Sequence, residues 1–171
     1  MGDETRLVVR PLVRWFKEQK ADWKVRPPKH ETAERGWDIV ARRKNYDLLI
    51  EAKYMAGPSI SSFAGLVSAP MADRKYPSSS YGVCGAIGIE PTRNIYQVLF
   101  DIMARNLRFW KHYGVDFRMK YIFFVQDRKV MKMPFADFLS IAKLYAASAK
   151  GKTLKQRRQI AKNLLTSGPS R

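Results

Sequence analysis

Apolar residues recur at helical spacing in three stretches of the chain, with charged residues on the opposite side of each stripe. The first covers residues 4–20, the longest covers residues 92–114, and the last begins near Pro134. Each pattern predicts a helix with one buried face. Pro11 lies inside the first stripe, and a proline inside a helix removes one hydrogen bond and clashes with the preceding turn. The first helix is therefore expected to begin near residue 8 or to bend there.

Short apolar runs between polar turns predict the strands. GWDIVAR and YDLLIEAKY should form two strands joined by a turn at residues 43–45, and KYIFFVQ and VMKMP a second pair around DRK. Residues 57–80, rich in Gly, Ser and Pro, are expected to form a loop or lid with one short helix. Helices and strands in this order predict an α/β domain. The expected strands cover residues 23–28, 36–42, 46–54, 81–91, 120–126 and 130–134.

Composition adds a strong positive charge to this picture. The 171 residues include 32 Lys and Arg against 15 Asp and Glu, which gives a formal net charge of +17. Hydrophobic residues make up 46% of the chain, which excludes a wholly disordered basic protein. Because an excess of like charge opposes compaction, it indicates a polyanionic partner. Nucleic acid is the first candidate and an anionic membrane surface the second.

The sequence carries no pattern typical of membrane insertion or secretion. No apolar run approaches the roughly 20 residues that span a bilayer, and the first residues lack a signal-peptide core. A cytoplasmic, intracellular protein without a transmembrane segment is therefore expected. Cys84 is the only cysteine and there are two histidines, which excludes disulfide frameworks and zinc sites built from Cys or His. Any metal should be a hard cation held by carboxylates.

Three charged residues, Asp38, Glu51 and Lys53, interrupt the apolar strands expected between residues 36 and 54. Side chains alternate along a strand, so Glu51 and Lys53 should lie on one face about 7 Å apart. Asp38, on an adjacent antiparallel strand, should lie opposite or diagonal to Glu51. Two close carboxylates repel unless a divalent cation neutralises both, and the lysine is then placed to contact a phosphate or a metal-bound water. The pattern predicts a site for phosphodiester hydrolysis.

Two alternatives compete with this site. The first is a salt-bridged, exposed two-stranded ribbon, but the three large apolar residues 48–50 favour a strand buried on both faces. The second is another acid-x-lysine triplet, since such triplets also begin at Glu18, Asp73 and Asp127. Asp127 is the main rival because Asp116 and a good strand precede it. Its triplet nevertheless falls at an expected hairpin turn, where charges are ordinary and solvated.

The spacing around these residues resembles that of a known family. Gly36-x-Asp38, twelve residues, and then Glu51-Ala52-Lys53 at the end of an apolar strand resemble the PD-(D/E)xK nuclease superfamily, which includes restriction endonucleases and Holliday junction resolvases. Trp37 stands where the family usually has a proline. The resemblance covers residues 4–54. It implies a restriction-endonuclease-like core, with a helix, a three-stranded meander, a crossover helix, further strands and, in this chain, basic C-terminal helices.

The chemistry of that family, carried over position by position, implies a metal-dependent nuclease. Asp38 and Glu51 would bind Mg²⁺, or Mn²⁺, with the carbonyl of Ala52 as a third protein ligand. Lys53 would position the attacking water or stabilise charge on the phosphate. Glu4 resembles the additional acid that resolvase-like members carry at the start of the first helix. The implied function is a DNA endonuclease acting on branched or duplex DNA, with a resolvase-like subtype and a homodimer as further expectations.

Two basic segments are candidates for contacting the nucleic-acid backbone. Arg42, Arg43 and Lys44 form a turn cluster that would either grip phosphate near the site or be solvated. The C-terminal segment, with candidate contacts at Lys155, Arg157 and Arg158, predicts a basic amphipathic helix. That helix would bind backbone, lie on a membrane or pack on the domain. The chain is therefore divided into a nuclease-like α/β domain, residues 1–149, and a basic extension, residues 150–171.

Two other functions remain open from the sequence. A non-catalytic, basic nucleic-acid-binding protein on an inactive nuclease-like core explains the charge equally well, but gives no reason to place Asp38, Glu51 and Lys53 in apolar strands. A peripheral membrane protein anchored by its tail predicts lipid binding that survives loss of the N-terminal half.

Overall fold

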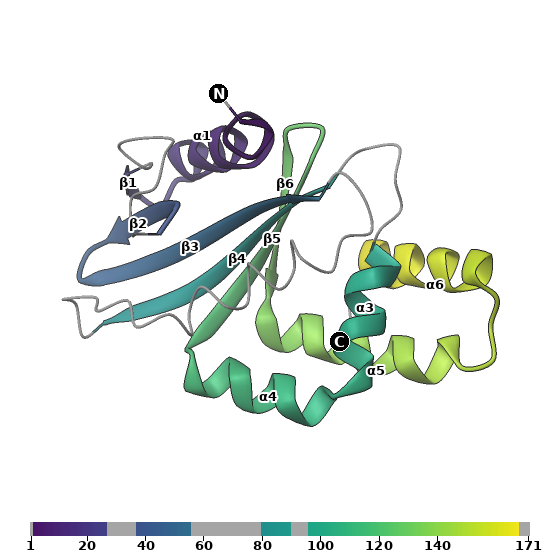
Figure 1. Ribbon diagram of the computed structural model, residues 1–171. Coiled ribbons are helices and arrows are strands. Elements are labelled where there is room, and N and C mark those ends of the chain that lie inside the picture. Colours follow the sequence, from purple (N-terminus) through teal and green to yellow (C-terminus); the bar gives the residue numbers. More distant parts are fainter. Residues whose placement is uncertain (1, 27–36, 56–79, 90–95, 168–171) are drawn as a thin grey trace.

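A mixed six-stranded sheet forms the centre of the protein, with strands in the order β1-β2-β3-β4-β5-β6. The computed structural model describes residues 2–26, 37–55, 80–89 and 96–167. Helices cover both faces of the twisted sheet (Figure 1). One face carries η1 (Thr5–Val9) and α1 (Arg10–Glu18), and the other carries α3 (Tyr96–Arg105), α4 (Leu107–Asp116), α5 (Phe135–Ala149) and α6 (Leu154–Ser167). The predicted α/β class is confirmed. The strands are β1 Lys24–Arg26, β2 Ile39–Arg43, β3 Tyr46–Met55, β4 Tyr81–Ile89, β5 Met119–Gln126 and β6 Lys129–Pro134.

Strand pairing follows the expected hairpins. β1, β2 and β3 pair antiparallel in sequence, with a turn at Lys44 whose φ is +53°. β5 and β6 also pair antiparallel, and Asp127 and Arg128 in their turn both have positive φ. The middle pairs, β3 with β4 and β4 with β5, are parallel. The short helix expected in the segment between β3 and β4 falls on residues 56–79, which lie outside the described residues.

The first helix changes its winding just before Pro11. It consists of a π-helical turn, η1 Thr5–Val9, followed directly by α1 Arg10–Glu18. The N–H of Arg10 donates to the carbonyl of Thr5, five residues back. Pro11 then falls in the first turn of α1, where a missing N–H costs least. The expected disturbance is therefore a wider turn, and the helix begins close to Glu4, not near residue 8.

A close contact with β4 holds this turn against the sheet. A Cβ atom built on Gly88 would lie 2.2 Å from a methyl carbon of Val8, so a glycine at position 88 is what lets η1 pack this closely on β4. The core on this side joins Val8, Leu12 and Phe16 to inward-facing strand residues such as Ile50. The start of η1 is thus fixed beside β3 and β4 by packing.

The prediction of one long helix over residues 92–114 is wrong in one respect, because the chain forms two helices there. α3 Tyr96–Arg105 and α4 Leu107–Asp116 are separated at Asn106, whose φ is −151°. The Asn106 side chain accepts a hydrogen bond from the N–H of Phe109, which caps α4. Asparagine at a helix start satisfies an N–H that would otherwise lack a partner. Apolar spacing continues through the break, so the stripe alone conceals it.

The C-terminal helices complete the larger core. α5 Phe135–Ala149 begins after Pro134 as predicted, and α6 Leu154–Ser167 follows it. α6 packs against α3 and α5, with Ala161 and Leu165 buried in the same core as the sheet residues of this face. Within the described residues, no helix is both long enough and apolar enough to cross a membrane.

Candidate active site

Asp38 is fixed against β3 by the pairing of β2 with β3. Ile39 pairs with Ile50 in the antiparallel register, so the residue before Ile39 faces the residue after Ile50. Oδ2 of Asp38 accepts a hydrogen bond of 2.7 Å from the N–H of Ala52. The expected placement of Asp38 next to Glu51 therefore follows from the strand register itself.

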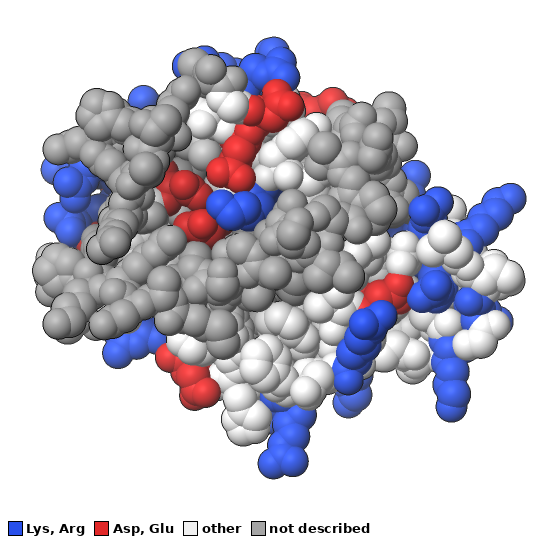
Figure 2. Space-filling model, in the orientation of Figure 1, with Lys and Arg blue, Asp and Glu red and all other residues white. Residues whose placement is uncertain are grey.

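Lys53 connects two acids that are distant in sequence. Its Nζ lies 3.0 Å from Oε1 of Glu51, the residue two positions earlier on the same face of β3. The same Nζ lies 3.7 Å from Oε2 of Glu4, at the start of η1. The structure thus brings together all four residues that the sequence proposed as catalytic. On the face drawn in Figure 2, acidic side chains gather near the N-terminal helix, whereas most basic side chains lie around the periphery.

The electrostatics of the cluster are unbalanced towards negative charge. Among the described residues it contains three carboxylates, of Glu4, Asp38 and Glu51, and one ammonium group, of Lys53. Burial chiefly, together with the charges of Glu51 and Glu4, raises the pKa of Asp38 to about 6, against the lowering effects of the Ala52 hydrogen bond and the Lys53 charge. Burial is the main cause of the raised pKa, and the smaller part that comes from the neighbouring acids is repulsion that a bound cation would relieve.

Lys53 stays protonated in this environment. Burial by itself lowers the pKa of Lys53, but the charge and hydrogen bond of Glu51, together with Glu4 and Asp38, raise it above its ordinary value. An ammonium group with a raised pKa donates hydrogen bonds and carries positive charge at neutral pH. It can therefore hold a water or a phosphate oxygen, but it is not suited to remove a proton.

The donor set fits a hard divalent cation in part. Carboxylate and carbonyl oxygens are the ligands that Mg²⁺ prefers, and Asp38, Glu51 and the carbonyl of Ala52 would supply them. In the part of the chain that the structure describes, no three Asp, Glu, His or Cys side chains are arranged to hold a metal by themselves. Mg²⁺ characteristically keeps several waters and takes one or two carboxylates together with substrate phosphate, which suits such a small set of ligands.

The acids and lysines of the two described competing triplets are exposed, and Asp127 and Arg128 also line a small pocket with Leu7 and Tyr54. Asp127, Arg128 and Lys129 form the exposed turn between β5 and β6, as the sequence predicted. Glu18 is exposed at the end of α1. The triplet beginning at Asp73 lies outside the described residues. Neither described triplet joins an acid to a buried strand in the way that Glu51 and Lys53 do.

The basic residues at the end of β2 and in the turn after it, Arg42, Arg43 and Lys44, have two different environments. Arg42 binds Asp47 with two hydrogen bonds of 2.7 Å, from Nε to Oδ1 and from a terminal nitrogen to Oδ2. Arg43 and Lys44 instead line a pocket of about 510 Å³, together with Trp23, Asn45, Tyr46, Leu48, Ser80 and Tyr121. The turn is thus at the far end of β3 from Lys53, which disfavours a phosphate contact beside the site and leaves the alternative of a solvated turn open.

The three candidates on α6 also differ from one another. Lys155 and Arg158 are exposed on the outer side of the helix. Arg157 faces inward, where a terminal nitrogen lies 2.9 Å from Oδ2 and 3.0 Å from Oδ1 of Asp101. The hydroxyl of Tyr145 donates to the same carboxylate at 2.6 Å. Arg157 therefore fastens α6 to α3 and α5, and the outer face keeps the basic residues that would reach a phosphate.

Sequence reasoning missed the aromatic residues of the 510 Å³ pocket. Trp23 precedes β1, Tyr46 begins β3 and Tyr121 lies in β5, so only the assembled sheet places them together. Their positions near the starts of the expected strands were the available signal, and it is a weak one.

Comparisons with known proteins found no counterpart for the chain. No protein-family model matches it, and neither a curated protein nor a solved structure does. The cluster of Glu4, Asp38, Glu51 and Lys53 is therefore interpreted from its own geometry and charge.

Proposed function

We propose that this protein is a metal-dependent endonuclease that hydrolyses phosphodiester bonds in DNA. One observation carries the proposal: Glu4, Asp38, Glu51 and Lys53 come from three separate segments and meet at the end of one buried strand. Their carboxylates outnumber the ammonium group, so the cluster has the charge that a divalent cation would balance. An ion pair that only stabilised the fold would not require more carboxylates than ammonium groups.

The order of elements supports the same proposal. A helix, three antiparallel strands and a fourth strand parallel to the third form the N-terminal part of the chain, and the acids occupy the second and third of those strands or their ends. This is the arrangement expected of a restriction-endonuclease-like core. The catalytic residues would then lie where the sheet ends against η1.

Each residue would have a distinct role. Asp38 and Glu51, with the carbonyl of Ala52, would hold Mg²⁺ or Mn²⁺. When bound, the cation supplies the positive charge that lowers the pKa of water and offsets charge on the phosphate. Lys53, as an ammonium ion, would orient the attacking water or contact a phosphate oxygen. Glu4 would keep Lys53 in place through their ion pair.

Binding of the substrate would rely on the net charge of +17 and on the exposed basic residues of α6. Lys155 and Arg158 would contact phosphates without reading sequence. Such contacts make binding strongly dependent on salt, because bound counterions are released from the DNA. Branched and duplex DNA are the proposed substrates, with two protomers providing a cut in each strand.

The decisive experiment is cleavage of a labelled panel containing a four-way junction, a flap, a linear duplex, single-stranded DNA and RNA, with and without Mg²⁺. The wild type should cut at least one member, and Asp38→Ala and Lys53→Ala should cut none while still binding. Asp127→Asn is the matched control, because it alters the acid of the rival triplet. If Asp127→Asn alone abolished cutting, the site assignment would be wrong.

A second candidate function has one observation in its favour. In the structure Lys53 already pairs with Glu51 and Glu4, which is what an inactive core would retain after losing its metal. A non-catalytic nucleic-acid-binding protein would then use the same charge for binding alone. Binding to the panel without cutting, in Mg²⁺ and in Mn²⁺, would select this function.

A further inference from the structure

A second basic region lies at the opposite end of β3 from the catalytic cluster. The 510 Å³ pocket adjoins one of about 570 Å³, and the two share Tyr46 and Ser80 in their walls. We call the combined feature the aromatic groove. It is lined by Trp23, Arg43, Lys44, Asn45, Tyr46, Leu48, Ser80, Tyr81, Gly114, Val115, Arg118, Met119, Lys120 and Tyr121. These described residues include four cations and four aromatic rings, and none of them is an acid.

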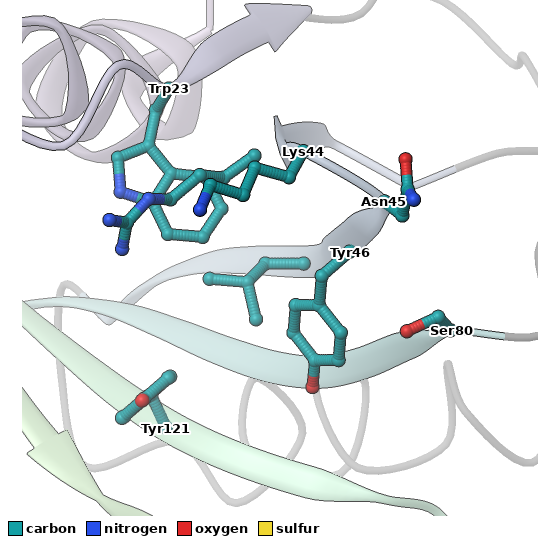
Figure 3. Close-up of a pocket in the computed structure, with 8 residues that line it drawn as sticks. Trp23, Lys44, Asn45, Tyr46, Ser80 and Tyr121 are labelled. Carbon is teal, nitrogen blue, oxygen red and sulfur yellow. The ribbon is translucent and has the colours of Figure 1, made fainter.

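The rings and cations of the groove are interleaved. Trp23 and Lys44 lie on one side of the first pocket, and Tyr46 and Tyr121 lie across from them (Figure 3). The guanidinium carbon of Arg118 lies 4.8 Å from the ring centre of Tyr81, and Nζ of Lys132 lies 3.8 Å from that of Tyr121. Cations that stack on rings stay beside the apolar surface and leave positive charge available at its rim.

The backbone under the groove leaves space for this arrangement. A Cβ atom at Gly82 would lie 2.4 Å from the hydroxyl oxygen of Tyr46 and 2.3 Å from a side-chain carbon of Lys120. Without that Cβ, a tyrosine from β3 and a lysine from β5 can both extend over β4. The pKa of Tyr46 is raised, chiefly by burial, so its hydroxyl remains a hydrogen-bond donor.

We propose that the aromatic groove binds an unpaired strand of nucleic acid, with bases stacked on Trp23, Tyr46 and Tyr121 and phosphates held by Arg43, Lys44, Arg118 and Lys120. Flat apolar bases linked by anionic phosphates match the rings and cations that the described residues supply. Duplex DNA hides the faces of its bases within the stack, so it would leave the rings unused. The identity of the ligand as nucleic acid rests on the proposed function.

The position of the groove defines which part of a substrate it would hold. Tyr46 and Lys53 are seven positions apart on β3, which is roughly 23 Å along a strand, and the odd separation points their side chains to opposite faces of the sheet. The groove therefore binds substrate away from the bond that is cut.

The test is a binding measurement in EDTA, so that its outcome does not depend on cleavage. Fluorescence anisotropy would compare a labelled oligo(dT) of about ten nucleotides with a duplex of similar length. Tyr121→Leu should weaken oligo(dT) binding about 10-fold and leave duplex binding within about twofold. Arg43→Gln/Lys44→Gln should weaken oligo(dT) binding and reduce its salt slope by about 1. Arg108→Gln/Lys111→Gln, an equal loss of charge from the exposed surface of α4, should change neither.

A second readout does not depend on comparing affinities. Base stacking on Trp23 should quench part of the tryptophan emission during the titration, and Trp23→Phe should remove that part while keeping a ring against Phe16. Equal weakening by the α4 control and by the groove variants would overturn the inference, as would unchanged binding by both groove variants. If the wild type cleaved DNA but the groove variants bound oligo(dT) normally, the groove proposal alone would fail. If the groove variants lost oligo(dT) binding but the wild type did not cleave, the nuclease proposal alone would fail.

Discussion

The two ends of β3 each bury a carboxylate, and they compensate for it differently. At the start of the strand, Asp47 is 1% exposed and receives two hydrogen bonds from Arg42. Near the other end, Glu51 is 7% exposed and shares the ammonium group of Lys53 with Glu4, beside Asp38. Among the described residues, Asp47 is paired with Arg42, whereas three acids lie around Lys53. A matched pair stabilises the fold, whereas an excess of like charge is tolerated where a cation or substrate completes it.

The largest expected effect is a difference in cleavage activity between substitutions at the two ends of β3. Glu51→Gln should lower Mg²⁺-dependent kcat by about 1000-fold, because it removes a ligand of the proposed metal while keeping the shape of the side chain. Asp47→Asn, the same change at the other end, should leave kcat within about threefold once the protein is folded. Single-turnover cleavage at saturating enzyme would measure both. Equal losses in the two variants would contradict the distinction.

Substitutions at the Arg42–Asp47 end should instead have the larger effect on the stability of the fold. Arg42→Ala leaves the buried Asp47 without its bidentate partner and should lower the free energy of unfolding by about 2 kcal/mol. The estimate is below that for a fully buried pair because the Arg42 side chain is 51% exposed. Urea unfolding followed by circular dichroism would measure the change. Arg43→Ala, the exposed neighbour, is the control and should stay within about 0.5 kcal/mol of the wild type.

The pKa of Asp38 gives the cluster a pH signature. Its pKa rises from 3.8 to about 6 on folding, so the protonated form is favoured in the folded state. The contribution of Asp38 to stability is therefore fully present below about pH 4 and is lost as the pH rises through 6. Without metal, Asp38→Asn should stabilise the protein by about 1–2 kcal/mol at pH 8 and by nothing at pH 4. A gain that was independent of pH would show that burial of this charge is not the cause.

The smallest effect concerns the metal alone. Mg²⁺ in about 10-fold excess over its dissociation constant should stabilise the wild type by about 1.4 kcal/mol, since it binds only the folded state. Glu51→Gln should lose this gain, and Asp47→Asn should keep it. Thermal unfolding with Mg²⁺ or with EDTA would measure the difference. A gain of similar size in all three proteins would indicate general binding of ions to the surface.

The local sequence pattern predicted those features of the fold and site that depend on residues close together in the chain. The register between β2 and β3 follows from one hairpin turn, so Asp38 and Glu51 could be placed together from residues 36–54 alone. Glu4 was accessible only through the family resemblance, and its contact with Lys53 depends on how η1 packs on the sheet. Whether these residues hold a metal and cut DNA stays a prediction.

What could not be predicted depends on long-range assembly. Tyr46 and Tyr121 lie 75 positions apart and meet because β4 pairs in parallel with both β3 and β5, and no local pattern encodes that pairing. Arg157 resembled its basic neighbours in sequence, and only the packing of α6 on α3 turns it towards Asp101. The break at Asn106 was hidden because apolar spacing continues on both sides of it.

The π-helical turn before Pro11 has a consequence for how the N-terminus tolerates insertions and deletions. A π-turn holds an additional residue compared with an α-turn, and each residue of an α-helix corresponds to a rotation of about 100°. Deletion of a single residue between Thr5 and Val9 would let the turn rewind as an α-turn and keep Glu4 on the side of Lys53, whereas deletion of a residue from α1 would rotate Glu4 away by about that angle. The wider turn thus absorbs one residue and maintains the angular phase of the first acid relative to β3.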